Sequence, residues 1–176
     1  NMIWADKKGN IGWQVVGIVP IRKNFSGYVP IPGDGRYEWS GYLPIKERAH
    51  LLNPSKNFFA TANQHVTPDT YEHWDAVGYT WADPYRGDRI NAVLNEKNNI
   101  SLEDMGQLQT DYFSIPASTL TPLLSKIKFE DSFTNAAKQF LMNWNFKLDK
   151  NSIAAGVYVA WEKQITFNAQ KYFVPE

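Results

Sequence analysis

The stretch MIWADKKGNIGWQVVGIVPI, residues 2–21, determines how the first half of the chain is interpreted. Two apolar runs, 2–6 and 11–19, flank the turn-forming residues KKGN, which predicts a β-hairpin. In the second run, Trp13 and Val15 point to one face and Val16 and Ile18 to the other, so we expect a strand that is covered on both sides.

The residues that follow, up to about residue 80, are rich in glycine, proline and aromatic side chains, which predicts strands joined by ordered loops. The segment 27–44 is expected to be an ordered, proline-rich loop. The segment 44–54 permits a short helix that ends at Asn53, before Pro54. The aromatic run of NFFATAN, residues 57–63, predicts a buried strand that ends on an amide.

From Asp83 onward the chain has helical periodicity and capping residues. Pro116 and Pro122 are expected to start or kink one segment, and in the last helix Ile153, Val157, Ala160, Trp161 and Ile165 are expected to face inward. The expected N-caps are Asp83, followed by Pro84 at the first helical position, and Ser101, Asp131 and Ser152. The pattern predicts an α+β fold over one segment, 1–176, with strands and ordered loops in 1–80 and mainly helices in 81–176.

Composition excludes several classes of partner. Lys plus Arg (18) balance Asp plus Glu (18), so no basic surface field favours nucleic acid or an anionic membrane. There is no cysteine, which excludes disulfides and a cysteine nucleophile. No apolar stretch approaches the roughly 20 residues that span a bilayer.

The sequence lacks several motifs of catalysis and cofactor binding. G-x-S-x-G, G-x-G-x-x-G, the P-loop and H-E-x-x-H are all missing. His50, His65 and His73 are too scattered to indicate a metal-ligand set, and we interpret them as loop or surface histidines.

Several stretches nevertheless resemble the penicillin acylase (penicillin amidase) family, in the order in which that family has them. They are WADKKGNIGWQVVGIVPIR, YVPIPGDGRYEWSGYLP, LLNPSKNFFATANQ, WADPYRGDRI, SLEDMGQLQTD and FLMNWNFKLDKNSIAAGVYVAWEKQ. Together they span nearly the whole chain and resemble an interior segment of the family's β-chain.

The resemblance implies an N-terminal-nucleophile hydrolase with a four-layer αββα fold, in which a serine exposed by self-cleavage attacks an acyl amide. The nucleophile, the acyl-binding pocket and the α-chain would lie outside this segment, so we expect the segment alone to be inactive. Its partners would be the rest of the β-chain, the α-chain and a small acyl amide substrate. The family also implies a periplasmic or secreted location.

Two residues match positions of the family's active site. Asn63, in TANQ, matches an asparagine that donates a hydrogen bond to the oxyanion, and Arg86, in WADPYRGDRI, matches an arginine that orients the site. From the residues alone, an Asx turn after a strand is the commoner role of an asparagine such as Asn63, and the family match reverses that preference. Arg86 is equally a helix-surface arginine paired with Asp83 or Asp88.

The resemblance requires no cofactor for catalysis, but some members hold a structural calcium ion. Here Asp75 matches an aspartate ligand and the carbonyl of Gly27 a backbone ligand. Because calcium takes six to eight oxygens, the remaining ligands would come from outside this segment. The alternative is that Asp75 is a solvated loop carboxylate.

The sequence is also compatible with a second function, that of a binding module. Aromatic residues make up 15% of the chain, and Tyr37, Trp39 and Tyr42 in the proline-rich loop suit a non-catalytic glycan- or peptide-binding module as well as simple packing. Apolar strands separated from their neighbours also predict that the isolated segment self-associates, swaps elements between copies, or uses its helical half as a cover.

Overall fold

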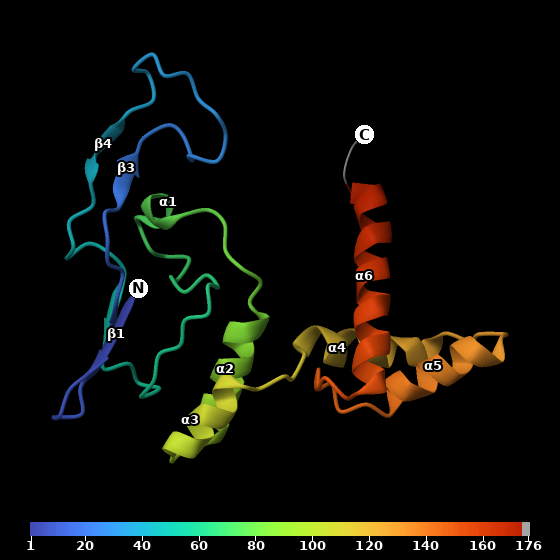
Figure 1. Cartoon of the computed structure of the whole chain (residues 1–176). Coiled ribbons are helices and arrows are strands. Elements are labelled where there is room, and N and C mark those ends of the chain that lie inside the picture. Colours follow the sequence, from blue (N-terminus) through green and yellow to red (C-terminus); the bar gives the residue numbers. More distant parts are fainter. Residues whose placement is uncertain (174–176) are drawn as a thin grey trace. The chain divides into compact units, whose positions relative to one another are not determined.

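A computed structural model describes residues 1–173 of the chain (Figure 1). The chain forms two compact units, Asn1–Asn98 and Asn99–Glu176, and each is described by itself. The first unit contains all the strands of the described residues and two helices, and the second is helical. The α+β class is confirmed, with strands in the first half and helices in the second.

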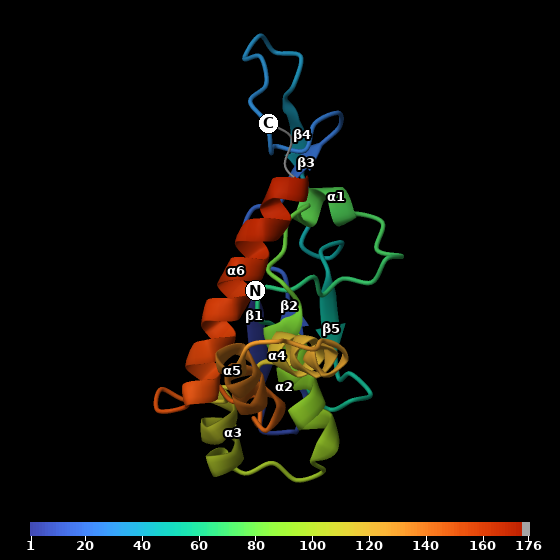
Figure 2. The same ribbon diagram turned by 90° about the vertical axis from the view of Figure 1, so that its right-hand side faces the viewer.

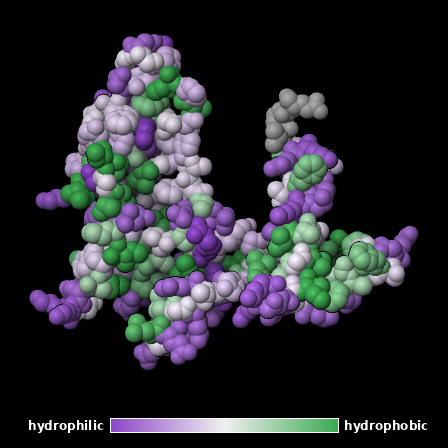
Figure 3. Space-filling view, viewed as in Figure 1, coloured by the Kyte–Doolittle hydropathy of each residue, from purple (hydrophilic) through white to green (hydrophobic). Residues whose placement is uncertain are grey.

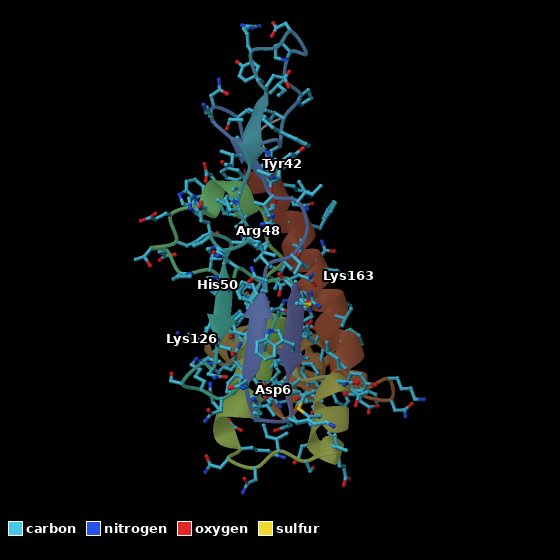
Figure 4. The ribbon with its side chains drawn as sticks, turned by 90° about the vertical axis from the view of Figure 1, so that its left-hand side faces the viewer. Asp6, Tyr42, Arg48, His50, Lys126 and Lys163 are labelled. Atoms are coloured by element: carbon cyan, nitrogen blue, oxygen red, sulfur yellow. The ribbon has the colours of Figure 1, made fainter. Side chains whose placement is uncertain are left out.

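The first unit is built on a three-stranded sheet with the order β1 (Met2–Ala5), β2 (Ile11–Gln14) and β5 (His50–Leu52), all antiparallel. The predicted hairpin of β1 and β2 is therefore confirmed. Asp6, labelled in Figure 4, closes the turn of this hairpin, and its carboxylate accepts from the backbone N–H of Lys8 and of Asn10. Hydrogen bonds from Asn10, first from its side chain, lower the pKa of Asp6 below its usual value of 3.8.

Strand β2 is shorter than expected and is not covered on both sides. It ends at Gln14, because Gly17 has a φ of +99° and the chain bends away there. Trp13 is buried at 3% exposure and stacks on Phe59 with ring centroids 4.7 Å apart, whereas Ile18 is 75% exposed. The expectation that Val16 and Ile18 lie under a cover is wrong for the described residues.

A second, two-stranded sheet pairs β3 (Pro20–Arg22) with β4 (Trp39–Tyr42). The loop expected over 27–44 thus contains a strand at its end. The short helix α1 (Trp74–Val77) packs against β3, and both views place it beside that sheet (Figures 1 and 2). Val19, Leu43 and Ala76 form the small core between them.

Two local expectations in this unit are wrong. The segment 44–54 is not a helix, since residues 50–52 form β5 and hydrogen bond to β2 (Figure 4 labels His50 on this strand). The segment 57–63 is not a strand, because it pairs with neither sheet, and Asn57 and Asn63 at its two ends have left-handed φ values of 59° and 68°.

Helix α2 (Tyr85–Glu96) completes the first unit. Its N-cap is Pro84, one residue later than expected, and the Asp83 carboxylate accepts from the backbone N–H of Tyr85 at 3.2 Å. Leu94 is buried, which confirms part of the expected apolar stripe.

The second unit contains α3 (Leu102–Gln109), α4 (Ile115–Leu120), the 3₁₀ helix η1 (Thr121–Lys126), α5 (Ser132–Met142) and α6 (Ile153–Phe173). Three predicted caps are confirmed. Ser101 forms a capping box with Asp104, Asp131 accepts from the backbone N–H of Thr134, and Ser152 accepts from that of Ala155.

The core of the second unit lies where α5 packs against α6 and η1. It contains Ala117, Leu124, Leu141, Trp144, Ala154, Ala155 and Tyr158. In α6, Val157 and Trp161 pack against this core as expected, but Ile153, Ala160 and Ile165 are exposed. The buried face is set instead by Ala154, Ala155 and Tyr158.

Neither unit is fully covered. Large apolar side chains reach the surface on both, and Figure 3 shows apolar patches over each. Across residues 1–173, no helix has the length and apolar character needed to cross a membrane.

Candidate active site

Asn63 lies at a tight bend of the first unit. Its backbone adopts the left-handed conformation, with φ of 68°, which asparagine tolerates better than most residues. Its carbonyl accepts from the N–H of Ala82 at 3.0 Å, which ties the bend to the segment that leads into α2. The side chain is exposed.

Arg86, in the first turn of α2, contacts this side chain directly. Its Nη2 donates to Oδ1 of Asn63 at 2.9 Å. A guanidinium has donors only, so the amide must turn its oxygen toward Arg86. The Nδ2 amino group of Asn63 therefore points away from Arg86, and no residue within 1–173 accepts a hydrogen bond from it.

The hydrogen bond to Asn63 bears on the two interpretations of Arg86. No salt bridge joins Arg86 to Asp83 or Asp88 in the part of the chain that the structure describes. Arg86 pairs with Asn63 instead, and its role in orienting a catalytic site stays a prediction.

Asn63 also borders a cavity of about 380 Å³. Its other walls mix apolar side chains, such as Trp13 and Trp81, with polar ones, such as Thr61 and Thr67. The site therefore combines a neutral amide, hydrogen bonded to a cation, with a space of mixed polarity beside it. Such an arrangement can donate a hydrogen bond to an oxygen that gains negative charge, without contributing a proton that titrates.

This pair has two close neighbours: Gln64, which from the sequence is expected to stabilise the loop, and Gly87, which was missed. The side chain of Gln64 folds back on the bend, and its Oε1 accepts from the N–H of Ala62 at 2.6 Å. Gly87 is buried in α2 against Gln64. A glycine inside a helical pattern was the available signal, because it costs about 1 kcal/mol relative to alanine and commonly has a packing reason.

The expected calcium ligands do not form a site by themselves. Asp75 lies in the first turn of α1, where its carboxylate accepts from the N–H of Ala76 at 2.9 Å. Gly27 lies in the loop after β3 with φ of +84°, and a side chain there would meet the guanidinium of Arg22. Residues 1–173 contain no cluster of three His, Cys, Asp or Glu side chains able to hold a metal ion. Two oxygens fall short of the six to eight that calcium requires.

The aromatic side chains of the proline-rich segment pair with each other or with neighbours. Trp39 and Tyr42 make an edge-to-face contact at 6.2 Å, and Phe25 and Tyr37 another at 6.1 Å. Trp39 and Tyr42 are each more than half exposed. Figure 4 places Tyr42 on β4, beyond α1 and away from β5.

The comparisons with known proteins agree on one family. The family model described as penicillin amidase matches residues 1–173. The penicillin acylase 2 proenzyme of Pseudomonas sp. (strain SE83) is 29% identical over 168 residues, which cover 94% of this chain and 21% of that protein. The acyl-homoserine lactone acylase QuiP of Pseudomonas fluorescens (strain Pf0-1) is 40% identical over 172 residues, covering 90% of this chain and 21% of that protein.

A solved structure shows the same fold. The thermostable penicillin G acylase from Alcaligenes faecalis superposes with a TM-score of 0.74 at 22% identity, and the match covers 99% of this chain and 33% of that chain. The chain thus spans about one fifth of the length of the first curated relatives it matches. Since the family model extends over all of the described residues, the chain belongs to the penicillin amidase family.

Proposed function

We propose that this segment forms one side of the acyl-transfer site of an amidohydrolase, with Asn63 donating to the oxyanion and Arg86 orienting Asn63. The reaction is cleavage of a linear acyl amide bond by an N-terminal serine that forms an acyl-enzyme. The relatives named above are acylases, which supports this class of reaction.

The observation that carries the proposal is the hydrogen bond from Nη2 of Arg86 to Oδ1 of Asn63. It commits the amide oxygen, so the amino group is the end available to a reacting carbonyl. Removing one preorganised donor of this kind costs about 3–4 kcal/mol of transition-state stabilisation in enzymes where it has been measured. A positive charge nearby also favours the neutral form of an α-amine, which is the form that acts as a base.

The rest of the site would come from polypeptide outside residues 1–176, namely the serine, further oxyanion donors and the acyl pocket. The rest of the β-chain and an α-chain would supply these residues and complete the four-layer αββα fold. The segment alone would then not hydrolyse amides. The substrate would be a penicillin-type or related N-acyl amide, and the enzyme would act in the periplasm or outside the cell.

A structural calcium ion would need ligands from that same outside polypeptide, with Asp75 and the carbonyl of Gly27 as this segment's contribution. The glycan- or peptide-binding alternative has weaker support, because the exposed aromatics pair with one another and the family match extends over the whole described segment.

The test is the Asn63→Ala variant of the complete protein that contains this segment, assayed with a chromogenic acyl anilide. We expect kcat to fall about 10²- to 10³-fold with KM little changed, because the donor acts on charge that develops only in the transition state. The matched control is Asn57→Ala, which changes another asparagine with left-handed φ in the same segment. An unchanged kcat in a folded Asn63→Ala variant would overturn the proposal.

A further inference from the structure

The bend that carries Asn63 is held by the side chain that follows it. Oε1 of Gln64 accepts from the N–H of Ala62 at 2.6 Å, and Nε2 donates to the carbonyl of Ala60 at 3.4 Å. One carboxamide thus satisfies two backbone groups on the chain entering Asn63. Such bonds stabilise a left-handed residue that would otherwise be one of several conformations of a loop.

Gly87 makes room for this carboxamide. A Cβ built at Gly87 would lie 2.5 Å from both Cδ and Nε2 of Gln64 and 3.0 Å from Cγ. Those distances are below van der Waals contact, so any larger residue must displace the Gln64 side chain. The displaced side chain would lose its hydrogen bond to Ala62, because that bond depends on the same carboxamide.

Gln64 and Gly87 are the sequence neighbours of Asn63 and Arg86, the pair that forms the candidate site. Gln64 follows Asn63 in the sequence, and Gly87 follows Arg86 in the first turn of α2. The contact between Gln64 and Gly87 therefore lies directly beside the hydrogen bond between Asn63 and Arg86. A shift at the first contact changes the distance and angle at the second.

We propose that Gln64 and Gly87 are positioning residues that hold Asn63 in its left-handed conformation against Arg86. This inference rests on the proposed function, since it assigns these residues to the placement of the oxyanion donor. Gln64 borders the same cavity as Asn63, but its carboxamide is hydrogen bonded to Ala62 and Ala60, so we assign it no contact with the reacting carbonyl. Their effect reaches the reaction through the position of Nδ2 of Asn63, so it falls on kcat rather than on substrate affinity.

The experiment is a double-mutant cycle in the complete protein, with Gly87→Ala, Gln64→Ala and the two combined. We expect each single variant to lower kcat by about tenfold or more with KM within about twofold, since misplacement by 1 Å can cost about a hundredfold. In the Gln64→Ala background the three atoms nearest to the added methyl are gone, so Gly87→Ala should cause little further loss. Such non-additivity marks residues in direct contact.

The matched control is Gly106→Ala, at a helical glycine in α3 whose Cβ would meet nothing within 4 Å. It should leave kcat unchanged, and alanine there is expected to favour the helix. Gln64→Met, similar in length but without the amide, should behave like Gln64→Ala if the hydrogen bonds matter.

The outcomes separate this inference from the proposed function. If Asn63→Ala lowers kcat while Gln64→Ala leaves it intact, the positioning role is wrong and the oxyanion role stands. The positioning role is also wrong if the fold-losses in kcat of Gly87→Ala and Gln64→Ala simply multiply in the double variant, because residues that act through one contact should not be independent. If Asn63→Ala leaves kcat unchanged, the proposed function itself is wrong, and the positioning role falls with it. If Gly87→Ala does not fold, the kcat values of Gln64→Ala, Gln64→Met and Asn63→Ala still test the positioning role of Gln64.

Discussion

Arg86 and Asn63, separated by 23 positions in the sequence, are joined by a hydrogen bond of 2.9 Å from Nη2 to Oδ1. The contact connects a bend of irregular backbone to the first turn of a helix. It therefore gives an exposed side chain a fixed orientation in a part of the molecule without regular secondary structure.

The first prediction concerns this bond. Arg86→Ala in the complete protein removes the group that orients the Asn63 amide, and we expect kcat to fall by up to about a hundredfold. Arg86→Lys should recover only part of the activity, because an ammonium does not reproduce the planar donor geometry of a guanidinium. Steady-state kinetics with an acyl anilide measures both variants.

Arg36→Ala is the control for loss of an arginine charge. Arg36 makes an exposed ion pair with Asp34 at 2.7 Å, and exposed pairs contribute little. Equal losses of kcat in Arg36→Ala and Arg86→Ala would show that net charge, and not the contact with Asn63, is responsible.

The second prediction concerns pH and the cap of α5. Hydrogen bonds from Thr134, first from its backbone N–H, lower the pKa of Asp131 below its usual value of 3.8. A carboxyl with a lowered folded-state pKa binds fewer protons when folded, so its stabilising effect is present above the unfolded pKa and is lost as pH falls through the folded pKa.

Asp131→Asn keeps an N-cap acceptor but removes the titration. We expect the difference in thermal midpoint between the original chain and Asp131→Asn to depend on pH below about 4, and to be constant at neutral pH. Circular dichroism at a series of pH values measures this difference. A difference that does not change across the acid range would contradict the prediction.

The third prediction concerns the core of the second unit. Leu141 is 3% exposed and packs where α5 meets α6 and η1. Leu141→Ala should lower the free energy of unfolding by about 2–5 kcal/mol, because it removes buried apolar contacts and leaves a cavity. Leu102→Ala, at a side chain that is 92% exposed, should change it by less than about 0.5 kcal/mol. Urea denaturation followed by circular dichroism at low protein concentration compares the two.

The fourth prediction is self-association of the isolated segment. Strand β1 is an edge of its sheet in the described residues, and its Met2 and Ile3 are about half exposed. The second unit has an open groove of about 1050 Å³ that includes the exposed side chains of Phe140 and Ile153. Unpaired edges and apolar surface of this kind favour association between copies.

Sedimentation velocity over a range of concentrations should show oligomers, and a hydrophobic dye should bind. Ile3→Lys should reduce the association, since a lysine on an edge strand opposes pairing. A segment that stays monomeric at high concentration and binds no dye would rule the idea out.

The sequence predicted best those features that depend on neighbouring residues. Ser101, Asp131 and Ser152 cap helices where expected, because a cap needs only the following turn. The turn at Asp6 is local in the same sense.

The failures involve distant contacts or backbone conformation. Residues 50–52 pair with β2, and this long-range ladder overrides a local pattern that permits a helix. The aromatics at 57–63 were interpreted as a strand, yet Phe59 is half-buried, stacks on Trp13, and lies in a segment that joins no sheet. The contact of Gly87 with Gln64 could not be predicted, because residue spacing does not show which loop approaches a helix.

The left-handed backbone at Asn63 restricts which amino acids can occupy this position at all. Glycine accepts the conformation but has no side-chain donor, and aspartate accepts it but brings a negative charge that would repel an oxyanion. Glutamine and serine can donate, but they adopt this conformation less readily. Histidine adopts it too, but its imidazole brings a proton that titrates, so asparagine suits the proposed donor role best and even conservative exchanges here should be poorly tolerated during evolution.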